Sequence, residues 1–405
     1  MNRLCNKLLW VVLICLGSSH YACEETITIP NTSLAGEGFI LPDGTEFTRT
    51  ALLESFGACI VNELKAFEEQ SHLFAVVATE SLDDPNNDSA VQEAWQDTID
   101  VWQRLEVMQV GPGDKSTRSG GLGLRDAIYA WPLNNECAVD SYLISEAYLA
   151  EESMIRFNAS GLTAAEYLLF HTETSHACEA DNEINTDGSW EMLDEDLLYL
   201  RRSTYAAVTA DMVAETATSL LNEWLPTGEN FLAEFTQAGE GSRFYGKKRV
   251  AINAVSDALS YVEWAVKDSK LAKPLGLRDC DQPFCSDLVE SKYGRRSKEH
   301  LKNNMIGFRK IFKGCGADNS GLGFDDYLYA LGQADLAEQI DEATINTISA
   351  IDAVEEKDLV TALETDLESV VNIHRTLDQL TDILRSDFII ALNLELPVMV
   401  QGDND

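Results

Sequence analysis

The sequence predicts an all-α protein built from two antiparallel helical bundles packed together, with an irregular N-terminal arm. From Thr48 onward, apolar residues recur at steps of three and four, and runs with strand-like alternation are few. Loops rich in Gly, Asp and Asn interrupt this pattern, as is typical of helices that fold back on one another. These loops lie at residues 83–89, 111–124, 180–189, 236–246 and 314–323. With 45% hydrophobic residues, the chain can form sizeable cores.

A secretory signal is predicted at residues 1–22. Arg3 and Lys7 provide a positive start, residues 8–16 form an apolar run, and a polar stretch leads to Ala22. A bilayer span needs about 20 apolar residues, and neither this run nor any later segment is that long. We therefore expect an exported protein without a transmembrane segment.

Cys23 directly follows the predicted cleavage point, which makes it a candidate for lipidation. A lipid on this residue would be the protein's sole contact with a membrane. His20 stands where bacterial lipoproteins usually carry leucine, so ordinary cleavage near Ala22 is the alternative. Residues 23–47, rich in Gly, Pro, Thr and Asn, form the predicted arm.

Apolar stripes with start and stop signals mark three long helices in the rest of the chain. The first contains Trp95 and stops near Gly111–Pro112. The second is capped by Ser297 and stopped at Gly314, and the third is marked by residues 373–384. We expect each stripe to face the core of a bundle.

The composition shifts at residues 236–246, where glycines cluster. We place a domain boundary here. Residues 48–238 then form the N-terminal bundle, and residues 239–405 form the C-terminal bundle.

The cysteine content predicts disulfides. If Cys5 and Cys15 leave with the signal and Cys23 is acylated, an even number remains, which suits an oxidising compartment. The remaining cysteines are Cys59, Cys137, Cys178, Cys280, Cys285 and Cys315. Cys280 and Cys285 are the best local pair, because the short segment between them contains a proline that favours a turn. A metal cluster is the alternative, but no Cys-x-x-Cys spacing occurs.

The formal net charge of −38 at pH 7 excludes some partners. A surface of this sign repels nucleic acid and anionic lipid, so we expect no nucleic-acid partner. It also attracts cations without regard to site, so acidity alone identifies no specific metal site.

Glu166 is the first candidate for a functional residue. It lies in an apolar helical segment introduced by Ser160, which can cap the first turn, and Thr163 falls three residues earlier on the same face. A carboxylate held against apolar surface is costly unless it is paired, protonated or bound to a metal. A purely structural ion pair or hydrogen-bond anchor at a helix contact is the alternative.

The segment Gly161-Leu-Thr163-Ala-Ala-Glu166 resembles the Gly-x-His-x-x-Glu signature of the imelysin family, with Thr163 in the place of the histidine. The resemblance extends over nearly the whole mature chain. Further matching segments are Ala94-Trp95 with Trp102 and Gly111-Pro112, Ile128 to Leu133 with Asp140, Arg201-Arg202, Glu290 to Gly294, Ser297 to Phe312, Gly321 to Asp326, and Gly402-Asp403.

The resemblance implies an all-helical, two-bundle protein of the bacterial cell envelope, typically periplasmic in Gram-negative bacteria and connected with iron acquisition. Partners would then be other envelope components of iron uptake. The family is named after a metallopeptidase, and relatives use the histidine and glutamate of the signature to bind metal. A threonine hydroxyl is a poor ligand at neutral pH, so we expect Glu166 to bind iron or zinc only weakly here.

Two functions remain as hypotheses. The first is a non-enzymatic protein that binds a metal, a small ligand or a partner between its bundles, because pockets concentrate at domain interfaces. Its candidate ligand-binding residues are Thr163, Glu166, Trp131, Arg125, Asp140 and Arg201. The two arginines could instead pair with Glu166 or Asp140 in a buried network. The second function is a metallopeptidase in which His171, His176 or a distant carboxylate replaces the missing histidine.

Overall fold

The structure is a computed structural model that describes residues 36–83, 88–150 and 155–397. The predicted signal, Cys23 and the first part of the predicted arm lie outside these ranges. The described part of the arm forms a small antiparallel hairpin of β1 (Phe39–Ile40) and β2 (Glu46–Phe47). Gly36–Asp405 form one compact unit, so the boundary proposed near residue 239 lies inside that unit and stays a prediction.

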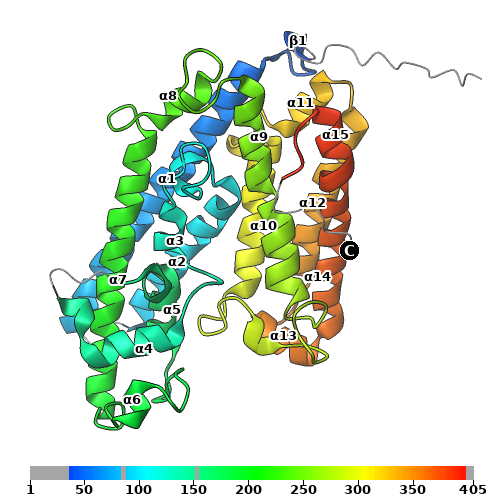
Figure 1. Cartoon of the computed structure of the whole chain (residues 1–405). Coiled ribbons are helices and arrows are strands. Elements are labelled where there is room, and N and C mark those ends of the chain that lie inside the picture. The colour runs from blue at the N-terminus through cyan, green and yellow to red at the C-terminus, as the bar shows by residue number, and fades with distance from the viewer. Residues whose placement is uncertain (1–35, 84–87, 151–154, 398–405) are drawn as a thin grey trace, which may run out of the picture. The chain divides into compact units, whose positions relative to one another are not determined.

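Four helices build the N-terminal bundle: α1 (Arg49–Glu80), α2 (Asp88–Leu105), α5 (Gly161–Phe170) and α7 (Glu195–Trp224). Helix α1 packs along α7 and α2, and α5 packs on α7 and α2 (Figure 1). The apolar stripes explain this arrangement, because they supply the fully buried rings of Phe67 and Trp102, whose centroids lie 4.8 Å apart. Shorter helices complete this half: α3 (Leu124–Ile128), α4 (Glu136–Ser145), α6 (Glu183–Thr186) and α8 (Phe231–Thr236).

The C-terminal bundle is also helical. Helix α10 packs on α12, and α12 packs on α14. Its elements are α9 (Lys248–Leu259), the π-helix η8 (Val262–Ala272), α10 (Ser297–Lys313), α11 (Phe324–Ala330), α12 (Ala334–Asp352), α13 (Leu359–Thr365), α14 (Leu367–Ile383), the π-helix η11 (Leu384–Phe388) and α15 (Ile389–Leu392).

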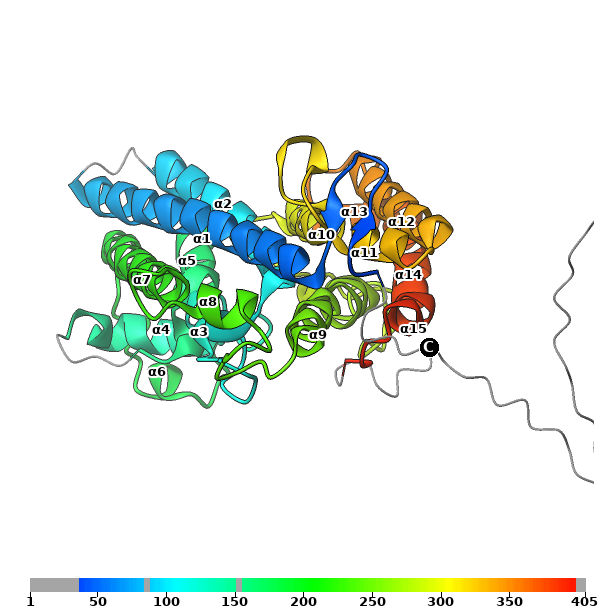
Figure 2. The ribbon, with the colours of Figure 1, turned by 90° about the horizontal axis from the view of Figure 1, so that it is seen from above.

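The two bundles share one hydrophobic core. Helix α10 packs against α2, and α9 packs against α1. In Figure 2, α1 to α8 lie on the left and α9 to α15 on the right. The hairpin reaches across to α11, where Phe47 stacks on Tyr327 with ring centroids 5.2 Å apart. The expected all-α fold of two packed bundles is therefore confirmed.

Three disulfides join the cysteines expected to be oxidised. Cys59 pairs with Cys315, Cys137 pairs with Cys178, and Cys280 pairs with Cys285. The first links α1 to the segment that directly follows α10 and so connects the two bundles. Within the described ranges, no helix is both long and apolar enough to cross a membrane.

Two predicted helix ends need correction. Helix α2 ends at Leu105, and the 3₁₀ turns Glu106–Met108 and Gly111–Gly113 continue the chain to the expected stop. Ser297 is the first residue of α10, with Arg296 at the cap position. The Ser297 hydroxyl donates to the carbonyl oxygen of Glu290 and so attaches α10 to the segment before it.

Candidate functional site

Glu166 lies where the two bundles meet. Its side chain comes from α5 of the N-terminal bundle, and the residue is only 5% exposed. Its Oε1 accepts hydrogen bonds from the backbone N–H groups of Tyr293, at 3.2 Å, and Gly294, at 2.9 Å. Both donors belong to the loop before α10, so this carboxylate connects the bundles through backbone hydrogen bonds.

The start of α5 is held by tertiary contacts. Ser160 occupies the cap position with extended backbone, but its side chain makes no capping hydrogen bond, contrary to the prediction. Gly161 has φ 72°, and an added Cβ would lie 2.5 Å from the carbonyl oxygen of Ile128, so only glycine fits. The indole N–H of Trp95 donates to the carbonyl oxygen of Leu162 at 2.9 Å. These contacts position the face of α5 that carries Thr163 and Glu166.

Burial changes the acidity of Glu166. Desolvation raises its pKa to about 7, although the hydrogen bond from the Gly294 N–H opposes the shift. Glu166 makes no ion pair with any residue in the described ranges. Its carboxyl group therefore exchanges a proton near neutral pH, and its charge is not neutralised by a salt-bridge partner.

A cavity of about 310 Å³ opens beside Glu166. Its walls come from both bundles: Tyr129, Trp131, Pro132, Asn134, Glu136, Thr163, Glu166 and Tyr167 from the first, and Ser269, Lys273, Asp287, Leu288, Val289, Ser291, Lys292 and Tyr293 from the second. Thr163 makes one long hydrogen bond, from its hydroxyl to the Ser160 carbonyl oxygen at 3.5 Å. The cavity thus combines aromatic rings with a buried carboxyl group.

Both lysines of the cavity are paired with carboxylates. Lys292 Nζ lies 3.4 Å from Glu136 Oε1, and Lys273 Nζ lies 3.1 Å from Asp279 Oδ2. Each lysine side chain is about a third exposed, at 33% and 36%. Their positive charges are thus already balanced close by, in contrast to the charge of ionised Glu166.

A buried polar network lies next to the cavity and is centred on Glu290. Its Oε1 accepts a hydrogen bond from the hydroxyl of Tyr129 at 2.6 Å. Its Oε2 lies 3.0 Å from Lys270 Nζ and 3.2 Å from His300 Nδ1. Burial alone would raise the pKa of Glu290, but the charges of Lys270 and His300 outweigh it and lower the pKa to about 2. Lys270 also donates to the Gln103 side-chain oxygen at 2.8 Å.

The structure brings three of the predicted binding residues together and leaves three outside. Thr163, Glu166 and Trp131 all line the cavity. Arg125 does not line it and does not pair with Glu166. It pairs with buried Glu106 at 2.8 Å and donates to the carbonyl oxygen of Trp131 at 3.0 Å, so it supports the cavity wall from behind.

Asp140 and Arg201 also have other partners than the sequence suggested. Arg201 pairs with Glu146 at 2.6 Å. Asp140 accepts hydrogen bonds from the Tyr167 hydroxyl at 3.1 Å and the Ala177 N–H at 2.8 Å. The hypothesis that these arginines neutralise Glu166 or Asp140 is therefore wrong. Arg125 pairs with Glu106 instead, and Arg201 pairs with Glu146.

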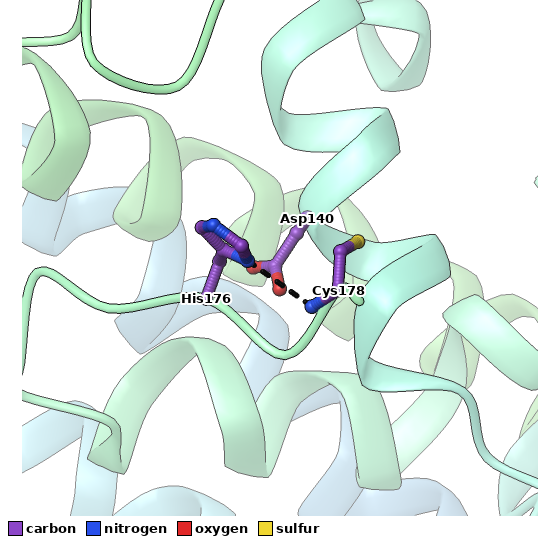
Figure 3. Close-up of side chains that lie close together, drawn as sticks. All are labelled: Asp140, His176 and Cys178. Atoms are coloured by element: carbon purple, nitrogen blue, oxygen red, sulfur yellow. Dashed lines mark hydrogen bonds between the residues drawn. The ribbon is translucent and has the colours of Figure 1, made fainter. Parts of the chain in front are cut away.

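The histidines proposed as substitute ligands have partners of their own. His171 stacks on Tyr167, and its Nε2 lies 3.0 Å from the Ser175 carbonyl oxygen. Among the described residues, one group of three His, Cys, Asp or Glu side chains has potential ligand atoms within 4.8 Å of one another, namely Asp140, His176 and Cys178 (Figure 3). Glu166 is not part of this group.

Sequence reasoning missed the half of the cavity contributed by the C-terminal bundle. In the sequence, the segment from Glu290 to Gly294 stands out only by its resemblance to the family, whereas in the structure the backbone N–H groups of Tyr293 and Gly294 donate to Glu166. Lys270 was missed because a lysine in a helix gives no sign of burial. The π-helix that carries it could not be predicted either, since π-helices are rare and interrupt otherwise ordinary helical patterns.

Comparison with known proteins agrees with the fold. The sequence model of the imelysin family matches residues 63–386. An imelysin-like protein from Psychrobacter arcticum has a similar structure, with a TM-score of 0.63 and 15% identity, over 86% of this chain and 96% of that one. A protein from Parabacteroides distasonis, named as an iron-regulated protein A precursor, has a TM-score of 0.64 and the same identity and coverage. No curated protein sequence matches this chain.

Proposed function

Because this chain belongs to the imelysin family, we propose that it is an exported binding protein of the bacterial cell envelope, connected with iron acquisition, that holds a small organic cation beside Glu166. The observation that carries this proposal is the cavity between the bundles, with a buried carboxyl group that has no salt-bridge partner among the described residues.

The chemistry of the cavity favours a cation. An ionised carboxylate at 5% exposure is costly, and a bound positive charge offsets that cost. Tyr129, Trp131 and Tyr167 supply aromatic rings, which attract ammonium groups by cation–π interaction. The ligand we favour is therefore a small amine. Iron and zinc are weaker candidates, because Thr163 offers no nitrogen ligand and Glu166 is outside the described group of convergent metal-binding side chains.

Export to the periplasm or another part of the cell envelope belongs to the same proposal. The predicted signal at residues 1–22 supports it, and three disulfides suit an oxidising compartment. The connection with iron rests on the family resemblance and on the name of the Parabacteroides distasonis protein. Mass spectrometry of the protein from its native host should find a mature chain that begins at or near Cys23. An intact Met1 would contradict export.

Calorimetry on the mature protein tests the binding site. The protein is stripped of metal with a chelator and titrated at pH 8 with benzylamine, Fe²⁺ and Zn²⁺ in separate experiments. We expect benzylamine to bind with a one-to-one ratio, and Glu166→Gln to weaken binding at least about tenfold, because it removes the negative charge. Glu146→Gln is the matched control, since Glu146 lies outside the cavity and pairs with Arg201.

Equal benzylamine binding by the wild type and Glu166→Gln would refute the proposed site. A tight single Zn²⁺ or Fe²⁺ site that depends on Glu166 would show that the ligand of this cavity is a metal ion and not an amine. The metallopeptidase alternative needs about three protein ligands on one ion together with an open position. Hydrolysis of a peptide by the zinc-loaded protein, lost in Glu166→Gln, would establish that alternative and overturn a purely binding role.

A further inference from the structure

Four potential metal ligands converge on the Cys137–Cys178 disulfide, away from Glu166. Cys137 and Asp140 lie three residues apart in α4, on one face of the helix. His176 and Cys178 lie two residues apart in the segment that follows α5. The ligand atoms of Asp140, His176 and Cys178 are all within 4.8 Å of one another, and Cys137 Sγ is bonded to Cys178 Sγ at 1.98 Å.

This set of atoms matches the preferences of zinc. Zn²⁺ takes four ligands in a tetrahedron from cysteine sulfur, histidine nitrogen and carboxylate oxygen, at about 2.0 to 2.3 Å. Such a tetrahedron separates neighbouring ligand atoms by about 3.5 Å. The separations among the ligand atoms of Asp140, His176 and Cys178, all within 4.8 Å, need to shrink only modestly, whereas the two sulfurs move apart once their bond opens. His176 and Cys178 lie in a segment without regular secondary structure that can adjust.

We propose that two-electron reduction of the Cys137–Cys178 disulfide opens a Zn²⁺ site formed by Cys137, Asp140, His176 and Cys178. A dithiol reductant supplies two electrons and two protons, breaks the S–S bond, and leaves as its own disulfide. Each new thiol then loses its proton as its sulfur binds the ion. While the disulfide is closed, the sulfurs are not thiolates and the ligand set is incomplete.

The surroundings orient the oxygen and nitrogen ligands. Asp140 is fully buried, and its carboxylate is held by the Tyr167 hydroxyl and the Ala177 N–H. The ring of His176 lies edge-on to Trp190 with centroids 4.9 Å apart, and its Nδ1 accepts the Cys178 N–H at 3.1 Å. Figure 3 shows the three side chains close together, with a dashed line for the hydrogen bond between the Cys178 N–H and the imidazole of His176. Metal sites commonly fix carboxylate ligands through such outer hydrogen bonds. Nδ1 of His176 carries the free lone pair of the neutral ring, so it would exchange the Cys178 N–H for the metal ion.

The other disulfides provide an internal comparison. Cys59–Cys315 and Cys280–Cys285 also yield pairs of thiols on reduction. Neither pair belongs to a group of three convergent ligands in the described part of the chain. If reduction merely exposed zinc-binding thiols in general, each pair would contribute. The proposed site instead requires one particular pair.

The test uses the full mature chain with Cys23→Ser, so that Cys23 cannot contribute a thiol. The protein is reduced with a phosphine under anaerobic conditions, and circular dichroism checks that it stays helical. Co²⁺ serves as a spectroscopic stand-in for Zn²⁺, because thiolate ligands give it a charge-transfer absorption in the near ultraviolet. Zn²⁺ affinity is then measured by competition with a coloured chelator. We expect one equivalent to bind the reduced protein at least about a hundredfold more tightly than the oxidised protein.

Variants decide between the outcomes. Cys137→Ser with Cys178→Ser should abolish the Co²⁺ absorption, whereas Cys280→Ser with Cys285→Ser should keep it. His176→Gln should weaken Zn²⁺ binding at least about tenfold. The proposal is overturned if both double-serine variants lose equal amounts of metal, which is also the result expected from an unfolded reduced chain. It is likewise overturned if His176→Gln leaves the affinity unchanged, or if oxidised protein binds Zn²⁺ equally well.

Discussion

The side-chain nitrogen of Lys270 lies 3.0 Å from Oε2 of Glu290, and each of these side chains is only 1% exposed. Lys270 also donates to the side-chain oxygens of Gln103 and Asn304, both at 2.8 Å. Gln103 belongs to α2 of the N-terminal bundle, and the other three belong to the C-terminal bundle. The buried charge pair therefore lies within the C-terminal bundle, and the hydrogen bond from Lys270 to Gln103 connects it to the N-terminal bundle. Both charges must be present, because removal of either one would leave the other buried without compensation.

Loss of this pair should destabilise the protein strongly. Lys270→Met removes the ammonium group and leaves Glu290 buried without its main partner, so we expect the free energy of unfolding to fall by about 3 to 5 kcal/mol. Urea unfolding measures the change. The matched control is Lys302→Met, because Lys302 pairs with Asp352 at 2.6 Å but the two side chains are 39% and 52% exposed. We expect it to cost less than about 1 kcal/mol. Similar losses in both variants would show that burial does not govern the pair.

The protonation of Glu166 should make the stability fall as pH rises. Its folded-state pKa of about 7 exceeds the ordinary glutamate pKa of 4.5, so the folded protein binds more protons than the unfolded chain between these pH values. The contribution of Glu166 to the free energy of unfolding is therefore largest below pH 4.5. It declines as the pH rises to 7, by at most about 3 kcal/mol. Glu166→Gln mimics the protonated group and should be more stable than the wild type at pH 8. Asp140, whose pKa burial raises to about 6, contributes equally to both proteins.

Urea unfolding at pH 5 and pH 8 checks this dependence on Glu166. The informative quantity is the difference between the wild type and Glu166→Gln at each pH. If that difference is the same at both values, Glu166 does not change its protonation in this range and its pKa is not raised.

Thr163→His should create a transition-metal site. Thr163 and Glu166 both line the cavity, so an imidazole at position 163 would add a nitrogen ligand close to the carboxylate. We expect calorimetry to show at least about tenfold tighter Zn²⁺ binding than in the wild type, and Thr163→His with Glu166→Ala to cancel the gain. Thr172→His is a suitable control, because Thr172 is exposed and outside the cavity. A tight wild-type site lost in Glu166→Ala would contradict the view that threonine weakens metal binding.

The disulfide between the bundles should stabilise the fold more than the local one. Cys59 and Cys315 are separated by 256 residues, whereas Cys280 and Cys285 are separated by 5. In the chain-entropy model a longer closed loop restricts the unfolded chain more, and the two disulfides differ by about 3 kcal/mol. We expect the double-serine variant of the first pair to melt at a clearly lower temperature than that of the second. Equal melting temperatures in calorimetry would show that loop length does not set their contributions.

Much of the fold was predictable because helices depend on local patterns. The start signal at Ser297 and the stop at Gly314 delimit α10 to within one residue, and both signals lie beside the helix they bound. Cys280 and Cys285 could be paired for the same reason, since they are only 5 positions apart in the sequence. Cys59 and Cys315 could not, because their proximity depends on how α1 packs relative to α10.

By itself, the sequence determined that Glu166 is a carboxylate on an apolar helix beside Thr163, because helical periodicity and apolar neighbours are local properties. Only the tertiary structure decided what surrounds it. The backbone N–H groups of Tyr293 and Gly294 arrive from 127 and 128 residues away, and Arg125 is drawn to Glu106 instead. Hydrogen bonds and ion pairs form with whichever partner the packing of distant helices brings within about 3 Å, and no local pattern specifies that partner.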